Sequence, residues 1–88
     1  MVRRTVSLAN RRGLHARASA KFVTLASSQP ASVEVEKDGS SVCGTSIMGL
    51  MMLGAAMGDS ITIHAEGEGA DEAVAALSQL VEDRFGED

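Results

Sequence analysis

The sequence predicts a small α+β fold in which helices cover one face of an antiparallel sheet. Segments with apolar side chains at every second position alternate with segments that carry an apolar stripe at helical spacing, in the order strand, helix, strand, strand, helix, strand, helix. In the expected strands, the residues that do not face the core are almost all polar. This pattern favours an antiparallel sheet with one solvent-exposed face over a doubly wound parallel sheet. The 88 residues are expected to form one domain, 1–88, with a single small core.

The first third of the chain predicts a strand and a helix. Residues 2–8 alternate as a half-buried strand, and residues 10–13 form a polar turn. Residues 14–28 carry one apolar stripe at helical spacing, and Pro30 ends this helix.

The middle of the chain predicts a β-hairpin. Residues 32–36 alternate as a strand, and residues 40–43 form the strand that returns beside it. Asp38-Gly39 joins them, because a type I′ turn needs a positive φ at both central positions and this pair adopts it readily.

The second half predicts a short helix, a strand and a last helix. Ser46 opens the short helix and Gly54 ends it, and residues 60–66 alternate as the fourth strand. The last helix is expected over residues 71–85, where the apolar spacing continues, and residues 86–88 are expected to fray.

The charge is distributed unevenly along the chain. Residues 1–33 hold six of the eight Lys and Arg residues and no acid, whereas residues 34–88 hold all twelve acids, for a net charge of −4. This asymmetry favours a local positive field that holds an anion. The alternative, in which folding mixes the charges and no field survives, stays open.

Composition excludes several classes of function. The only aromatic residues, Phe22 and Phe85, provide no stacking platform for nucleic acid, so no nucleic-acid partner is expected. The sequence also predicts no membrane span and no export signal, and the single Cys43 suits a reducing, cytoplasmic compartment. His64, on the wet face of the last strand, is expected to be an ordinary solvated residue. No pattern predicts a metal site, a nucleotide cofactor or a catalytic triad.

The motif at residues 13–17 (Gly-Leu-His-Ala-Arg) is the most informative about chemistry. His15 is expected at or beside the N-cap of the first helix, where backbone N–H groups lack partners and a positive imidazolium is disfavoured. A neutral imidazole is nucleophilic, and a phosphoryl group on it would lie against the amides of Ala16 and Arg17. The Arg17 guanidinium would bind that phosphate, and Arg12 would add a second cation. On chemistry alone, the alternative that His15 merely caps the helix stays open.

Ser46 is a candidate for modification at the start of the second helix. It is expected to be the N-cap, with Thr45 as the rival cap one residue earlier. A phosphate is tolerated at a helix start, although an ordinary cap is the simpler interpretation.

The same helix is rich in methionine and too short to bury all its apolar side chains. By spacing, Leu50 and Met51 are expected to face the core. Ile47 and Met48 are expected on the surface, where methionine adapts to several partners.

These two motifs, at residues 13–17 and at residues 46–54 (Ser-Ile-Met-Gly-Leu-Met-Met-Leu-Gly), resemble those of the HPr family. This family comprises the histidine-containing phosphocarrier proteins of the bacterial phosphoenolpyruvate-dependent phosphotransferase system. The likeness covers nearly the whole chain, including its length, its order of elements and the separation of the motifs. It implies an open-faced β-sandwich with four antiparallel strands and three helices on one side. It also implies a phosphoryl carrier acting between other proteins rather than an enzyme with turnover.

The resemblance assigns roles to individual residues. It implies that His15 receives a phosphoryl group on Nδ1 from enzyme I and passes it to a IIA-type protein, while Arg17 and the backbone amides of Ala16 and Arg17 hold the phosphate. It makes Ser46 the target of HPr kinase/phosphorylase, so that a phosphate there regulates transport by weakening the docking of enzyme I. The expected partner patch comprises Ile47, Met48 and Met51. The carrier is expected to be a cytoplasmic monomer with neither metal nor cofactor.

Three positions depart from the family pattern. Ala18 stands where Pro is usual, Thr45 where Lys is common, and Arg12 where a small polar residue is common. Arg12 leaves open which group bonds to the imidazole. The sequence also leaves open whether the chain serves sugar uptake or the nitrogen-related regulatory branch. A further alternative is a non-catalytic binding module of the same fold, controlled by Ser46, with His15 idle.

Overall fold

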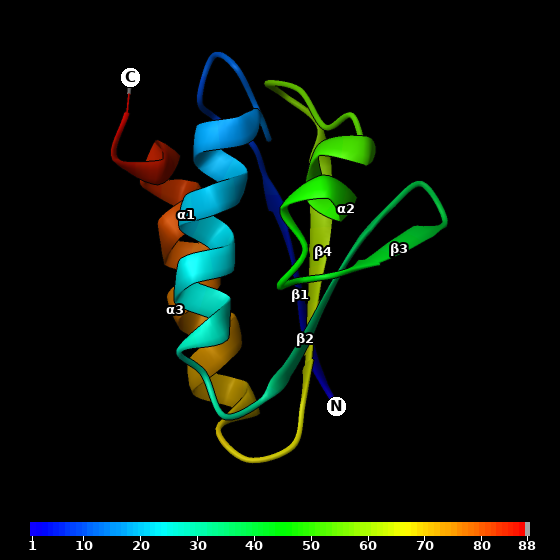
Figure 1. Ribbon diagram of the computed structural model, residues 1–88, viewed down its shortest axis with the longest axis vertical. Coiled ribbons are helices and arrows are strands. Elements are labelled where there is room, and N and C mark those ends of the chain that lie inside the picture. The colour runs from blue at the N-terminus through cyan, green and yellow to red at the C-terminus, as the bar shows by residue number, and fades with distance from the viewer. Residues whose placement is uncertain (88) are drawn as a thin grey trace.

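The structure, a computed structural model, describes residues 1–87 and contains the elements in the predicted order (Figure 1). The strands are β1 (Val2–Ser7), β2 (Ser32–Lys37), β3 (Ser40–Cys43) and β4 (Ser60–Glu66). The helices are α1 (Ala16–Ser27), α2 (Ile47–Met52) and α3 (Ala70–Glu82), followed by a single 3₁₀ turn, η1 (Arg84–Gly86).

The four strands form one antiparallel sheet in the order β1-β4-β2-β3. The helices lie on one face of this sheet, which confirms the predicted α+β class and the open-faced arrangement (Figure 1). The other face is polar: Thr5 Oγ1 lies 2.9 Å from Thr62 Oγ1, and His64 Nε2 lies 3.0 Å from Glu36 Oε1. His64 is therefore paired with a carboxylate rather than simply solvated, because β2 places Glu36 beside it.

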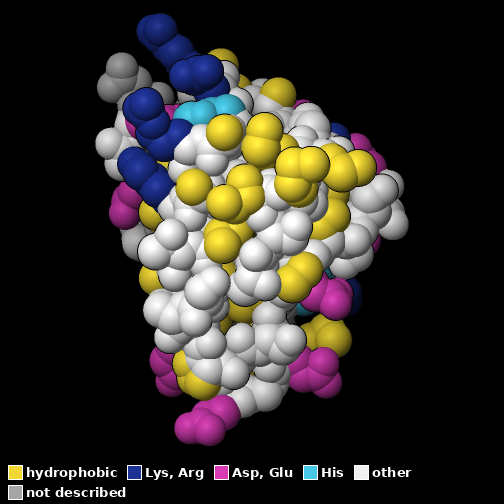
Figure 2. Space-filling model, viewed as in Figure 1, with side chains coloured by type: hydrophobic (Ala, Val, Ile, Leu, Met, Phe, Trp, Pro, Cys, Tyr) yellow, Lys and Arg dark blue, Asp and Glu magenta, His cyan; other side chains and the backbone are white. Residues whose placement is uncertain are grey.

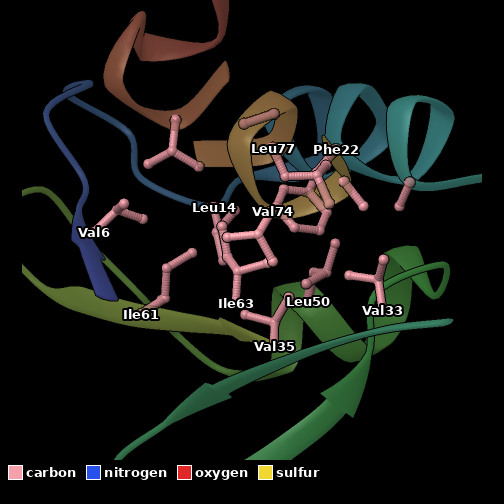
Figure 3. Packing of buried hydrophobic residues seen from close by; sticks show 14 of the residues in the cluster. Val6, Leu14, Phe22, Val33, Val35, Leu50, Ile61, Ile63, Val74 and Leu77 are labelled. Atoms are coloured by element: carbon pink, nitrogen blue, oxygen red, sulfur yellow. The ribbon is translucent and has the colours of Figure 1, made fainter. Parts of the chain in front are cut away.

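The core lies between the sheet and the helices (Figure 3). Phe22 of α1, Leu50 of α2 and Leu77 of α3 are fully buried there. They pack with Val35 and Ile63, which point inward from β2 and β4. Burying each large side chain contributes roughly 1.5–3 kcal/mol, so these contacts hold each helix in place on the sheet. The core thereby sets where the first turns of α1 and α2 lie.

The end of the chain differs most from the prediction. Helix α3 ends at Glu82 rather than at Phe85. Arg84 and Phe85 have φ values of 58° and 56°, in the left-handed region, so the chain turns back instead of continuing as a helix. Phe85 is still fully buried, because the turn directs its side chain into the core. The apolar spacing therefore identified a core residue correctly but assigned it to the wrong local structure.

Two further observations concern residues 1–87 as a whole. No helix among them is long and apolar enough to cross a bilayer. Nor do these described residues bring together three His, Cys, Asp or Glu side chains in a way that would hold a metal ion.

Candidate functional site

His15 is the N-cap of α1, with extended backbone angles of φ −76° and ψ 179°. The first helix thus begins at Ala16, two residues later than predicted. The preceding loop is held close to the α2–β4 connection, because the Leu14 N–H donates to the Ala55 carbonyl at 3.0 Å. Gly13 is required here: its φ is +59°, and a Cβ atom would lie 2.3 Å from the Ala55 oxygen. This close approach positions His15 at the start of the helix.

The two ring nitrogens of His15 have different partners. Nδ1 lies 3.3 Å from the backbone nitrogen of Arg17 and accepts its hydrogen. Nε2 lies 2.9 Å from Glu87 Oε1 and 3.2 Å from Glu87 Oε2. An amide N–H can only donate and a carboxylate can only accept, so these contacts assign the proton to Nε2 and leave the lone pair on Nδ1.

The His15 side chain is half-buried, with 14% of it exposed, and lies outside the hydrophobic core. The amides of the first helical turn are only partly as expected. The Arg17 N–H is not unpaired, because it donates to Nδ1 of the histidine that caps the helix. Within residues 1–87, the Ala16 N–H has no such partner. A group attached to Nδ1 would occupy the lone pair to which the Arg17 N–H now donates, so this N–H would become free to donate to the attached group.

Glu87 belongs to the site, although it was not among the residues predicted from the sequence. The Asn10 Nδ2 group donates to Glu87 Oε1 at 2.8 Å and to the Gly13 carbonyl at 2.8 Å. Hydrogen bonds from His15 and then from Asn10 lower the pKa of the Glu87 carboxyl below its ordinary value, although partial desolvation opposes them. The expectation that residues 86–88 fray is therefore wrong for Glu87, while Asp88 lies outside the described residues.

No local pattern in the sequence marks Glu87, because it lies 72 positions after His15. It reaches the ring only because the left-handed turn after α3 reverses the chain. In Figure 1 the 3₁₀ turn that follows α3 lies beside the start of α1. Glu87 also resolves the question raised by Arg12, since it supplies a hydrogen-bond partner for the imidazole.

Basic side chains lie to one side of the histidine (Figure 2). Four of them, which we call the basic rim, are exposed in the loop before His15 and on the first turns of α1: Arg11, Arg12, Arg17 and Lys21. Figure 2 shows Lys and Arg side chains gathered next to a histidine at one end of the molecule. The Arg17 guanidinium makes no ion pair with any described residue. Folding has thus placed four of the six cations of residues 1–33 near this end, while Arg3 and Arg4 lie in β1.

Ser46, and not Thr45, caps α2. Its Oγ accepts the Gly49 N–H at 3.0 Å, and its carbonyl accepts the Leu50 N–H at 3.0 Å. The Thr45 hydroxyl instead lies 3.0 Å from Cys43 Sγ, and this contact lowers the pKa of the thiol. Ser46 is half-buried, with its hydroxyl engaged in the cap.

An apolar surface extends over α2 and the loop after it. We call this surface the α2 patch; its members are Ile47, Met48, Met51, Met52 and Met57. Leu50 is fully buried as predicted, but Met51 is 42% exposed, so the expectation that it faces the core is wrong. A helix of six residues turns one narrow face inward, and Leu50 occupies it. Because α1 and α2 pack together, the patch lies alongside the basic rim, as the hydrophobic atoms near the histidine in Figure 2 illustrate.

Comparison with known proteins supports the resemblance seen in the motifs. The family model described as "PTS HPr component phosphorylation site" matches residues 2–83. The phosphocarrier protein HPr of Cupriavidus necator is 42% identical over 87 residues, which are 99% of this chain and 98% of the relative. The phosphocarrier protein HPr of Pseudomonas aeruginosa is 47% identical over 83 residues, covering 93% of this chain and 92% of the relative.

Solved structures agree in fold as well as in sequence. The crystal structure of HPr-C-His from Thermoanaerobacter tengcongensis has a TM-score of 0.95 at 43% identity, covering 100% of this chain and 99% of that one. A structure described as an HPr dimer from the same organism has a TM-score of 0.78 at 44% identity, covering 99% and 100% of the two chains. With its motifs, site geometry and full-length relatives in agreement, the chain belongs to the HPr family of phosphocarriers of the phosphotransferase system.

Proposed function

We propose that this phosphocarrier accepts a phosphoryl group from enzyme I on Nδ1 of His15 and passes it to a histidine of a IIA-type protein. It acts as a covalent intermediate and not as an enzyme with turnover. The observation that carries the proposal is the orientation of the ring, whose Nδ1 lone pair faces the amide-rich start of α1 while the proton resides on Nε2.

The transfer balances without an added proton acceptor. The Nδ1 lone pair attacks the phosphorus of the phosphorylated enzyme I, a new P–N bond forms, and the old P–N bond breaks. The electron pair of the broken bond stays with the donor's imidazole. Passing the group to the IIA-type protein repeats the step, with Nδ1 of His15 as the leaving atom.

The surroundings of Nδ1 suit the three phosphoryl oxygens. The amides of Ala16 and Arg17 lie at the positive end of a helix of 12 residues, which favours an anion. The Arg17 guanidinium, which has no carboxylate partner among the described residues, binds the oxygens in a bidentate manner. Partners dock through the α2 patch and the basic rim, which together match an acidic surface with an apolar centre.

The test uses the second histidine as a matched control. The wild type, His15→Ala and His64→Ala are incubated with phosphoenolpyruvate and enzyme I. We expect an acid-labile, base-stable phosphate on the wild type and on His64→Ala, and none on His15→Ala. Transfer that persists in His15→Ala would contradict the proposal. A wild type that takes no phosphate from enzyme I would favour the alternative of a binding module in which His15 is idle.

Ser46 is the proposed regulatory site, modified by HPr kinase/phosphorylase. Its Oγ lies at a helix start beside the α2 patch, so a phosphate there places two negative charges next to an apolar docking surface. The test is incubation with ATP and the kinase, which should give an acid-stable phosphate that is absent in Ser46→Ala and retained in Thr45→Ala. Survival of the phosphate in Ser46→Ala would move the site elsewhere.

The remaining expectations concern the state of the carrier in the cell. Residues 1–88 act as one phosphocarrier domain, a monomer in the cytoplasm, where an exposed Cys43 stays reduced. Because the related HPr structure from T. tengcongensis is described as a dimer, the oligomeric state should be measured. Light scattering at micromolar concentration should give the mass of one chain, 9.1 kDa, and a doubled mass would overturn this expectation.

A further inference from the structure

We infer that Glu87 is a positioning residue for phosphoryl transfer: its carboxylate holds the Nε2 proton of His15 and stabilises the positive ring that forms when Nδ1 is phosphorylated. The inference rests on the proposed function of His15. It assigns a chemical role to a residue near the end of the chain. Hydrogen bonds and an anchored turn hold this residue beside His15.

The carboxylate is held from two sides. One oxygen, Oε1, accepts both the His15 Nε2 proton at 2.9 Å and an Asn10 Nδ2 proton at 2.8 Å. Asn10 is fully buried and is itself fixed by its second donor bond, to the Gly13 carbonyl. The Asn10 Oδ1 atom has no partner among residues 1–87, so Asn10 contacts Glu87 only as a hydrogen-bond donor.

The backbone before Glu87 is strained and anchored. Arg84, Phe85 and Gly86 all have positive φ values, of 58°, 56° and 74°, and a non-glycine residue in this region costs roughly 1–2 kcal/mol. Such strain persists only where other contacts determine the conformation, and it gathers at functional sites. Here those contacts are the buried Phe85 ring and the Lys21 Nζ group, which donates to the Phe85 carbonyl at 2.7 Å. The strained turn therefore directs Glu87 to the ring.

The chemistry of the ring explains what the carboxylate does. When the Nδ1 lone pair attacks phosphorus, the proton stays on Nε2 and the ring becomes a phosphoimidazolium with a positive charge. A carboxylate 2.9 Å from Nε2 stabilises that charge, in the way an acid orients and supports a catalytic histidine. It lies on the Nε2 side of the ring, and so it does not face the incoming phosphoryl oxygens. The same positive ring is the better leaving group in the second transfer.

Two variants separate the hydrogen bond from the charge. Glu87→Gln keeps an oxygen that accepts the Nε2 proton but removes the charge, whereas Glu87→Ala removes both. Glu82→Gln is the matched control, because Glu82 is an exposed acid at the end of α3 and makes no contact with His15. Urea unfolding of all three variants confirms that each is folded.

The first measurement needs no partner protein. In ¹⁵N-histidine-labelled wild type, proton NMR in water should show the His15 Nε2 proton protected from exchange. The signal should remain in Glu87→Gln and Glu82→Gln and disappear in Glu87→Ala. The inference is overturned if the wild-type proton exchanges as fast as the proton of the Ala variant.

The second measurement is the rate of phosphorylation by enzyme I as the carrier concentration is varied. Glu87→Gln should lower the rate at saturating carrier roughly 10-fold, the lower end of the range for partners that orient a histidine, and leave the half-saturating concentration unchanged. A rate within twofold of the wild type would overturn the inference. Failure of the proposed function looks different, since the wild type itself would then take no phosphate while its Nε2 proton remained protected.

Discussion

The starts of α1 and α2 are built alike and surrounded differently. In each, the side chain of the capping residue accepts a backbone N–H of the first turn: His15 Nδ1 from Arg17 at 3.3 Å, and Ser46 Oγ from Gly49 at 3.0 Å. The first lies among basic side chains with a carboxylate behind the ring, and the second lies among exposed apolar side chains. Under the proposed function both helix starts take a phosphate, and the neighbouring side chains decide whether that phosphate is transferred or acts as a regulatory signal.

The bond lengths support this division of roles. The His15 cap bond is long, so the Arg17 N–H loses little when it turns from Nδ1 to a phosphoryl oxygen. The Ser46 bond is shorter and closes a helix of only six residues, which has few other contacts to hold its first turn. Under the proposed function, His15 can therefore gain and lose a phosphoryl group at little cost to its cap, whereas a phosphate on Ser46 would disturb a cap on which the short helix depends.

The largest effect should come from replacing the nucleophile while keeping a cap. Asn is among the best N-cap residues, so His15→Asn should abolish phosphorylation by enzyme I and change the free energy of unfolding by no more than about 1 kcal/mol. A phosphotransfer assay and urea unfolding measure the two quantities. Transfer by His15→Asn at the wild-type rate would show that the first helix start does not carry the nucleophile.

Removing the exposed cation next to His15 should have the next largest effect. Arg17→Ala removes a bidentate donor to the phosphoryl oxygens, and loss of one such donor lowers a rate roughly 100-fold. Arg11→Ala is the matched control, since it removes an exposed positive charge from the same rim but lies in the loop before His15 rather than in the first turn of α1. Rapid-mixing measurements of transfer should separate the two variants. Equal rates would remove Arg17 from the site.

A charge at the second helix start should act on docking rather than on chemistry. Ser46→Asp places a carboxylate beside the α2 patch. A docked partner would have to remove water from this carboxylate, which costs free energy and weakens docking. We expect the half-saturating concentration in enzyme I assays to rise about 10-fold, equivalent to ~1.4 kcal/mol, with little change in the maximal rate. Ser40→Asp, in the exposed strand β3, adds the same charge elsewhere and should leave both values unchanged. An effect on the maximal rate alone would contradict a docking role.

The smallest expected effect is on the pH dependence of stability. The pKa of Glu87 is lowered below its ordinary value of 4.5, first by the hydrogen bond from His15 and then by the one from Asn10. A lowered folded-state pKa means that the carboxylate contributes stability above pH 4.5 and loses it as the pH falls through the folded-state value. The urea midpoints of wild type and Glu87→Gln should therefore differ at pH 6 and converge in acid. A difference that grows in acid would contradict this assignment.

Much of the fold was predictable, because it depends on local patterns. The alternation in residues 60–66 and the Asp38-Gly39 turn define strand and hairpin without reference to the rest of the chain. The apolar stripe of α1 likewise placed Phe22 in the core. Met51 was misassigned because the width of the buried face depends on how α2 packs, which spacing alone does not show.

The candidate site divides in the same way. The sequence by itself determined that a histidine and a serine begin two helices, since capping depends on neighbouring residues, and it placed the basic residues near the first of them. Only the tertiary structure decided which group faces Nε2 and where the proton resides. Glu87 meets His15 through a left-handed turn and a buried Asn10, both of which are stable only because distant parts of the chain pack around them.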